Sequence, residues 1–339
     1  MGTWLRRRRG LVPYMLLLPG LLWLLIFFAY PLVEVFLASF WSGSVIRGYV
    51  FSLSNWTNYT DAIGPVLPQL GRSLVYALAA TILTFLIAYP LAYTIALRGG
   101  RAKNVLLFLV VAPFFTSFLL RTLSWKILLG DDGVIFGPLK EIGLLPDEFR
   151  VLATPMAVVA GITYNLLPFM TLPIYVALEK VDFRLVEAAR DLYAGPWKRG
   201  GIVAGGAVGG ILAAGLAFSF GWPLPPIVIG AAVIGAVLGR FFVSEAFVRV
   251  TFPLSLPGVF AGSLLTFIPA IGDYVNAEFL GNPDTRMLGN VIQNRFLTQN
   301  DFPAASALSF ILMGGILIIV AIYTRLLGTE DVTGHAPRL

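Results

Sequence analysis

The stretch of residues 305–327 reads ASALSFILMGGILIIVAIYTRLL. No charged residue occurs in it before Arg325. A helix of about 20 apolar residues, rising about 1.5 Å per residue, spans the roughly 30 Å hydrocarbon core of a bilayer. The stretch therefore predicts a transmembrane helix rather than a helix on the surface of a water-soluble core.

The same pattern recurs over five further ranges, which are 12–40, 72–97, 105–129, 155–178 and 254–276. Of the 339 residues, 58% are hydrophobic and 12% are charged, whereas soluble domains carry about 25% charged residues. So much apolar surface cannot be buried in one water-soluble core. The sequence predicts an all-α integral membrane protein with six core transmembrane helices.

Two more apolar stretches, 201–221 and 227–243, flank a proline cluster at 222–226. Because prolines end helices, we expect an apolar helical hairpin inserted at 199–246. Glycines recur every fourth residue in it. This spacing favours close helix packing within the hairpin, and the alternative is a docking face for another subunit. We expect the hairpin to cross the membrane twice, and a hairpin that stays cytoplasmic is the competing outcome.

Most of the 24 Lys and Arg residues fall into the terminal segments and the loops that the predicted spans place on one side. Cytoplasmic loops of membrane proteins are enriched in basic residues. We therefore predict a cytoplasmic N-terminus (1–11), a two-part membrane domain (12–198 and 247–327) and a cytoplasmic tail (328–339). The aromatic residues lie within apolar runs rather than between basic residues, so nucleic-acid binding is not expected.

Residues 179–192 read EKVDFRLVEAARDL. The residues are strong helix formers of mixed charge, with an apolar stripe that includes Leu185, Ala188 and Leu192. Connections between packed helices usually have about 2–8 residues. This longer amphipathic, cytoplasmic helix is suited to docking a partner, and a solvated loop helix is the alternative.

Further motifs accompany this segment. Glu187-Ala188-Ala189 is followed by GPW at 195–197 and FVRVTFPLSLPG at 247–258. Together these resemble the "EAA" coupling loop of binding-protein-dependent ABC importers. Four other phrases resemble the spermidine/putrescine permease branch: LRT at 120–122, YNLLPF at 164–169, IPAIGDY at 268–274 and MLGNVI at 287–292. The resemblance covers 12–198 and 247–327.

The resemblance implies a permease subunit in the cytoplasmic (inner) membrane of a prokaryote, carrying a small solute, with a polyamine favoured. It also implies a second permease subunit, an extracellular or periplasmic solute-binding protein and an ATPase subunit. The sequence contains no GxxxxGK[ST] phosphate-binding loop, so we expect ATP to be hydrolysed on the separate subunit. The residues expected to couple to that ATPase are Glu187, Ala188, Ala189, Arg190, Asp191, Gly195, Arg249 and Pro253.

Two departures from the family pattern affect this coupling loop. Tyr193 stands where the family usually has glycine, and residues 200–246 separate two segments that usually lie a few residues apart. Both changes bear on how the ATPase would dock.

Charged residues at membrane depth are costly, and we treat them as candidates for function. Asp273, followed by Tyr274, is placed by the pattern in the fifth span, where a carboxylate suits a cationic amine. The rival interpretation is an acid at a helix break near the outer interface. Arg121, Tyr164 and Asn165 are the other candidates for the substrate path, and Arg121 could instead snorkel or pair with an acid.

Two other functions are alternatives to an importer permease. A stand-alone secondary transporter of a small organic cation would show inverted repeats with matching broken helices, and none is visible. A membrane enzyme would need a nucleophile–histidine pair or a metal cluster. The chain has no cysteine and one histidine, His335, in a polar tail. We therefore expect no catalytic residue, metal or cofactor.

Overall fold

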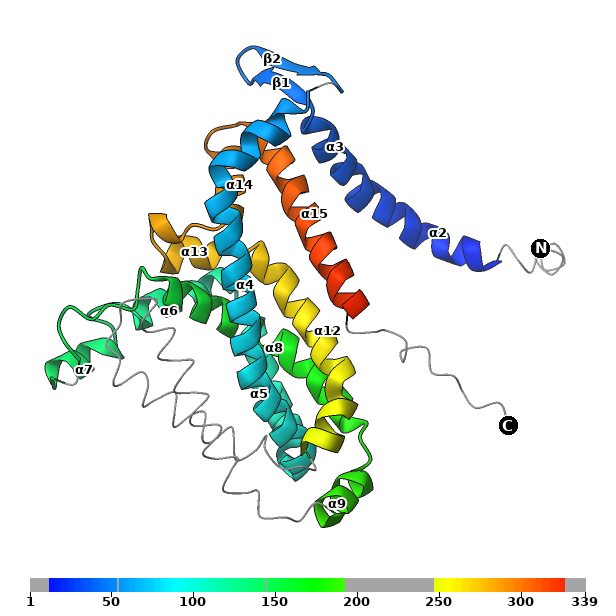
Figure 1. The fold of residues 1–339 in the computed structure, drawn as a ribbon, viewed down its shortest axis with the longest axis vertical. Coiled ribbons are helices and arrows are strands. Elements are labelled where there is room, and N and C mark those ends of the chain that lie inside the picture. The colour runs from blue at the N-terminus through cyan, green and yellow to red at the C-terminus, as the bar shows by residue number, and fades with distance from the viewer. Residues whose placement is uncertain (1–11, 54, 144, 193–246, 327–339) are drawn as a thin grey trace. The chain divides into compact units, whose positions relative to one another are not determined.

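The computed structural model describes residues 12–53, 55–143, 145–192 and 247–326 (Figure 1). The prediction of an all-α membrane protein is confirmed. Among these described residues, five helices are long and apolar enough to cross a membrane, and a bent helix pair makes a sixth if it counts as one span. Tyr193, Gly195 and the inserted segment 199–246 lie outside the described residues.

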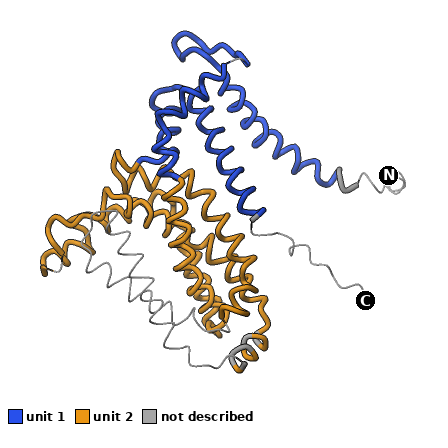
Figure 2. The backbone as a smooth tube through the Cα atoms, viewed as in Figure 1, with its two compact units in different colours: residues 1–73, 286–339 blue, residues 74–285 orange. Residues whose placement is uncertain are grey.

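The chain divides into two compact units, Met1–Ser73 with Arg286–Leu339 and Leu74–Thr285 (Figure 2). In the first unit, the predicted span 12–40 is formed by three consecutive helical segments, α2 (Val12–Leu24), η1 (Leu25–Ala29) and α3 (Tyr30–Ala38). The unit also holds the first part of α4 (Thr57–Arg98), α14 (Leu288–Leu297) and α15 (Phe302–Leu326). Ala62 and Val66 of α4 pack with Leu288 and Leu308 in its core.

A two-stranded antiparallel ribbon, β1 (Trp41–Ser44) and β2 (Gly48–Phe51), follows α3 and was not predicted. The ribbon is tied to the same unit, because Tyr49 Oη of β2 donates to the Asn300 carbonyl at 2.8 Å. Asn58 Nδ2 donates to the carbonyls of Ser39 and Trp41, also at 2.8 Å. Strands of four residues are too short to leave a readable period in the sequence.

The second unit holds the rest of α4 and the remaining elements. These are η2 (Gly100–Ala102), α5 (Lys103–Val111), η3 (Ala112–Phe115), α6 (Phe118–Leu128), α7 (Phe136–Glu141), α8 (Pro155–Glu179), α9 (Phe183–Leu192), η4 (Phe247–Thr251), α12 (Phe252–Ile271), α13 (Val275–Leu280) and η5 (Pro283–Thr285). Predicted spans 72–97, 155–178 and 254–276 correspond to α4, α8 and η4 with α12, and span 305–327 of the first unit corresponds to α15.

The predicted third span, 105–129, is not one straight helix. Gly100–Phe115 and Phe118–Leu128 meet at an angle of 95°. Thr116 leaves the helical region, with φ −99° and ψ 149°. Its Oγ1 donates to the Pro113 carbonyl at 2.7 Å, a local bond that competes with continued helix. The bend therefore lies at Thr116 and Ser117, between Phe115 and Phe118.

Helices α8 and α12 pack against each other more extensively than any other helix pair in the described part of the chain. Gly258 and Gly262 of α12 make this close approach possible. A Cβ on Gly258 would lie 2.5 Å from both Ala177 Cβ and the Pro173 carbonyl, and one on Gly262 would lie 2.9 Å from Met170 Sδ. Small residues four apart allow membrane helices to approach closely.

Candidate coupling site and buried polar network

Helix α9 carries the first half of the expected coupling motif. It begins at Phe183, and the preceding Asp182 caps it, since its Oδ1 accepts from the Arg184 backbone N–H at 3.0 Å. Glu187, Ala188 and Asp191 are exposed. The side chains of Ala189 and Arg190 lie outside the described part of the structure. Leu185 is also exposed, so the helix presents an apolar residue together with charged ones.

Segment η4 carries the second half. It packs against α9, although the two segments are far apart in the sequence. Within η4, Phe247 and Thr251 are buried and Arg249 is exposed. Pro253 lies in the first turn of α12, which continues directly from η4. The structure thus brings the two predicted halves of the coupling motif together.

A set of aromatic rings anchors η4 to the core. The Phe247 ring centroid lies 5.5 Å from that of Tyr89 and 5.9 Å from that of Tyr93, both on α4. The hydroxyl groups of Tyr89 and Ser255 are 2.7 Å apart, which joins α4 to the first turn of α12. Sequence reasoning missed both residues. In the sequence, each appears only as a hydroxyl-bearing residue within an apolar span, which does not indicate that the two meet.

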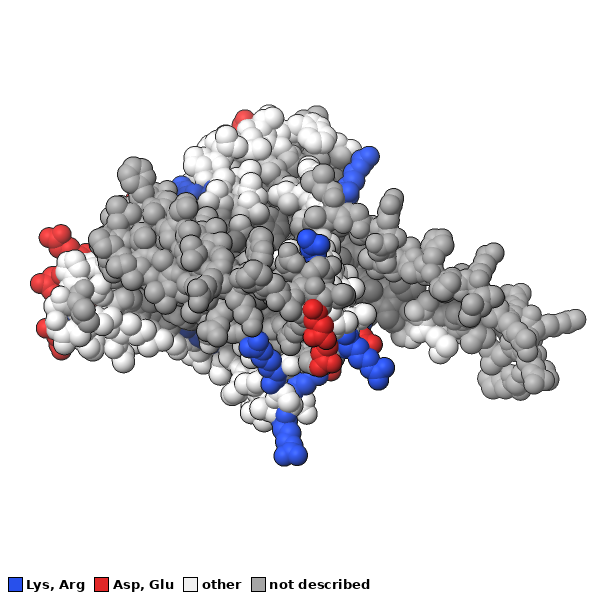
Figure 3. All heavy atoms as spheres, turned by 60° about the horizontal axis from the view of Figure 1, so that its bottom comes forward, with Lys and Arg blue, Asp and Glu red and all other residues white. Residues whose placement is uncertain are grey.

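Charged side chains of both signs gather at the end of unit 2 that carries α9 (Figure 3). The basic residues there include Lys103, Lys180 and Arg184, and the acidic residues include Glu179 and Glu187. This surface can form ion pairs with a partner, and its mixed sign favours protein recognition over simple attraction to anions.

A buried polar network surrounds Asn165, near the middle of α8. Asn165 Nδ2 donates to Asn276 Oδ1 at 3.1 Å and to Thr122 Oγ1 at 3.3 Å. These side chains come from α8, α13 and α6, and all three are buried. Gly161 leaves room for the network, because a Cβ there would lie 2.7 Å from Asn276 Oδ1. Thr122 and Asn276 were missed from the sequence, since single polar residues in apolar runs leave no pattern.

Asp273 joins this network through Asn276. Its Oδ1 accepts from the Asn276 backbone N–H and its Oδ2 from Asn276 Nδ2, both at 2.8 Å. It lies after the end of α12 at Ile271 rather than within the fifth span, in the break before α13. Burial raises the pKa of its carboxyl to about 6, and the bonds from Asn276 oppose that shift. Its position is that of an acid at a helix break.

The other candidates for the substrate path lie in different surroundings in the described structure. Tyr164 packs edge-on against Trp125, with ring centroids 5.3 Å apart. The Arg121 guanidinium lies 5.0 Å from the Phe114 ring centroid, and its Nε and Nη1 are buried without a hydrogen-bond partner. Tyr274 is 43% exposed. Asn165 and Asp273 are linked through Asn276.

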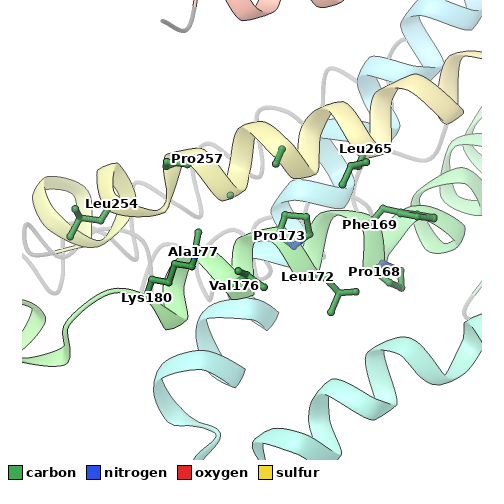
Figure 4. A pocket seen from close by; sticks show the side chains of 12 residues that line it. Pro168, Phe169, Leu172, Pro173, Val176, Ala177, Lys180, Leu254, Pro257 and Leu265 are labelled. Atoms are coloured by element: carbon green, nitrogen blue, oxygen red, sulfur yellow. The ribbon is translucent and has the colours of Figure 1, made fainter. Parts of the chain in front are cut away.

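An open groove of about 660 Å³ runs between α8 and α12 (Figure 4). Its lining includes Phe169 and Pro173 from α8, Leu254 and Leu265 from α12, and Lys180, which directly follows α8. The lining is apolar except for this one cationic residue. The groove therefore offers no acidic group for a cationic solute. Among the described residues, no group of three or more His, Asp or Glu side chains could hold a metal ion.

Known proteins resemble this chain in sequence and fold. Residues 243–327 match the family model "Binding-protein-dependent transport system inner membrane component". The spermidine/putrescine transport system permease protein PotB of Haemophilus influenzae is 33% identical over 304 residues, which cover 89% of this chain and 90% of that protein.

Two solved structures of a bacterial alginate ABC transporter share the fold. The first, described as importing the acidic polysaccharide alginate, has a TM-score of 0.60 at 17% identity and covers 95% of this chain and 97% of its own. The second, in complex with an alginate pentasaccharide-bound periplasmic protein, has a TM-score of 0.58 at 16% identity and covers 98% and 99%. The sequence and fold favour an ABC importer subunit over a stand-alone secondary transporter. The chain belongs to the family of binding-protein-dependent transport permeases, as a multi-pass inner-membrane permease subunit in the branch of the spermidine/putrescine permease proteins.

Proposed function

We propose that this permease moves a polyamine across the inner membrane, driven by a separate ATPase subunit that docks on α9 and η4. The observation that carries the proposal is the contact between these two segments. Exposed Glu187 and Ala188 on α9 and Arg249 on η4 form one surface for the partner. Asp191 and Pro253 flank it, and Ala189, Arg190 and Gly195 belong to the same motif by sequence.

The orientation follows from this docking surface. ATP is cytoplasmic, so α9 must face the cytoplasm if it contacts the ATPase. Counting the bent pair Gly100–Phe115 and Phe118–Leu128 as one span, the described residues contain four spans before α9 and six in total. Because η4 contacts α9, the chain between them leaves and returns on one side. The even number of described spans on each side of this contact supports our proposal that both termini face the cytoplasm with α9. Loss of ATPase coupling on Glu187→Lys would therefore support this orientation as well.

The partners follow from the kind of complex. A permease of this family would pair with a second permease subunit and receive its solute from an external binding protein. One structural relative was solved with its periplasmic protein bound, which supports the same arrangement here. Lipid surrounds the exposed apolar residues of α2 and η1, such as Leu16, Trp23 and Phe28.

A polyamine is favoured as the solute because the relative from Haemophilus influenzae is named for spermidine and putrescine and aligns over most of both chains. The polar network is also compatible with a cation, since Asp273 contributes a carboxylate and the three residues linked to it are uncharged.

The solute class can be tested with the complete importer in proteoliposomes: both permease subunits, the ATPase and the binding protein. We expect ATP-dependent uptake of radiolabelled spermidine that excess unlabelled putrescine inhibits and an anionic oligosaccharide does not. Spermidine uptake that needs no ATPase, or uptake of the anionic sugar alone, would contradict the proposal.

Asp273→Asn separates the carboxylate's charge from its role at the helix break. Asparagine caps helices about as well as aspartate, so the start of α13 is preserved while the charge is lost. If the charge contacts a cationic solute, we expect uptake to fall about tenfold, equivalent to ~1.4 kcal/mol, with unchanged capture by the binding protein. Asn276→Ala is the control, because it removes the side-chain partner of Asp273 but keeps the charge. Wild-type uptake by Asp273→Asn would leave Asp273 only its structural role.

A further inference from the structure

An ion pair joins the end of α8 to the start of α5. Lys103 Nζ lies 2.6 Å from Glu179 Oε1, and the two side chains are 27% and 48% exposed. Lys103 Nζ also lies 5.2 Å from the ring centroid of Tyr175, one turn earlier on α8. One lysine thus contacts the last turn of α8 at two points.

Glu179 lies immediately before the connection that leads to α9. It is the last residue of α8, and only residues 180–182 separate it from α9. The Val181 N–H donates to the Leu178 carbonyl at 3.2 Å, and the Leu185 N–H donates to the Asp182 carbonyl at 3.0 Å. The connection is therefore short and hydrogen-bonded at both ends. A force on α9 reaches α8 at Glu179.

Lys103 stands on a tight turn between α4 and α5. The Ala102 N–H donates to the Gly99 carbonyl at 2.9 Å. A Cβ on Gly99 would lie 2.5 Å from the Ile95 carbonyl, and Gly100 has φ +46°, so larger side chains are strained at both positions. Ile95, Tyr175, Leu178 and Phe247 belong to one buried cluster. The lysine is thus held by the same core that anchors η4.

We propose that the Lys103–Glu179 ion pair is a positioning element of ATPase coupling, which fixes the direction in which α9 leaves α8. The pair links the end of α8, from which α9 follows, to the turn between α4 and α5. Movement of α9 therefore displaces α4, α5 and α8 together. This inference rests on the proposed docking of the ATPase at α9. Partly exposed ion pairs contribute little to folding stability, so the positioning role can be separated from unfolding.

The test is a charge swap in the complete importer in proteoliposomes. The variants are Lys103→Glu, Glu179→Lys and the double exchange. Spermidine uptake and ATP hydrolysis stimulated by the loaded binding protein are measured together, with ATPase co-purification as the check of assembly. We expect each single variant to assemble but to transport at least about fivefold less solute per ATP hydrolysed. A loss of this size lies within the usual range of coupling free energies. The double exchange restores the pair and should recover most of that loss.

Arg295→Glu is the matched control. Arg295 Nη1 lies 2.8 Å from Asp301 Oδ2 with similar exposure, 23% and 38%, and both residues belong to the other unit. We expect it to keep the wild-type ratio of transport to hydrolysis. Single variants with a wild-type ratio, or a double exchange no better than the singles, would overturn the positioning role. If the loaded binding protein does not stimulate ATP hydrolysis by the wild-type complex, the proposed function itself is refuted.

Discussion

Gly258→Leu is expected to prevent folding of the membrane domain or assembly of the importer. A Cβ at this position would lie 2.5 Å from Ala177 Cβ and from the Pro173 carbonyl, and 3.1 Å from Ile174 Cα. Two of these three atoms belong to the backbone of α8, so the clash cannot be relieved by rotating a side chain. Overpacking of a close contact costs about 1–3 kcal/mol, and more where backbone must move. Because α8 leads to α9 and α12 continues from η4, the coupling site would be separated as well.

Thermal unfolding of the purified permease in detergent, followed by co-purification with the ATPase, measures this effect. Gly314→Leu is the control, because a Cβ there meets no atom within 4 Å and the side chain can turn toward lipid. We expect the control to keep its stability and its partners. Equal melting temperatures and equal assembly of the two variants would show that α8 and α12 do not pack through Gly258.

The apolar spans were predictable because a bilayer demands long uncharged runs, and such runs are visible residue by residue. Their ends and breaks depend on local polar contacts that hydropathy does not report. The run 105–129 is long and apolar enough to be read as one helix, yet it bends by 95° at Thr116 and Ser117, where Thr116 Oγ1 bonds to the Pro113 carbonyl. The fifth span ends at Ile271, where Asp273 starts a new helix by bonding to Asn276.

The candidate sites were predictable to different degrees. The charged, amphipathic pattern of 179–192 indicated a docking helix, and the helix is present from Phe183. Its contact with η4 followed only from the family resemblance, since the residues between them give no distance information. Asn165 and Asp273 were both candidates, but Asn276, which links them, has no distinctive sequence context. Nor does sequence separation reveal that Lys103 meets Glu179.

Glu187→Lys is expected to abolish uptake while the protein still folds. Glu187 is exposed on α9, and exposed substitutions usually change folding stability by less than about 0.5 kcal/mol. A reversed charge at the centre of a docking surface can cost about 2 kcal/mol or more of binding, roughly a 30-fold loss of affinity. The ATPase would then hydrolyse ATP without moving the permease, or would fail to bind.

Glu141→Lys provides the matched control. Glu141 ends α7, is exposed, and belongs to the same unit as α9. It falls between the bent pair and α8, so the orientation proposed above would put it on the outer side of the membrane. The same charge reversal there is expected to leave uptake and ATP hydrolysis unchanged.

The most direct measurement is spermidine uptake and ATP hydrolysis in the same proteoliposomes, compared between wild type, Glu187→Lys and Glu141→Lys. If α9 is the surface through which the ATPase drives this permease, uptake falls to background in Glu187→Lys alone, and the loaded binding protein no longer stimulates hydrolysis. Wild-type uptake by a normally assembled Glu187→Lys complex would contradict the coupling role of α9.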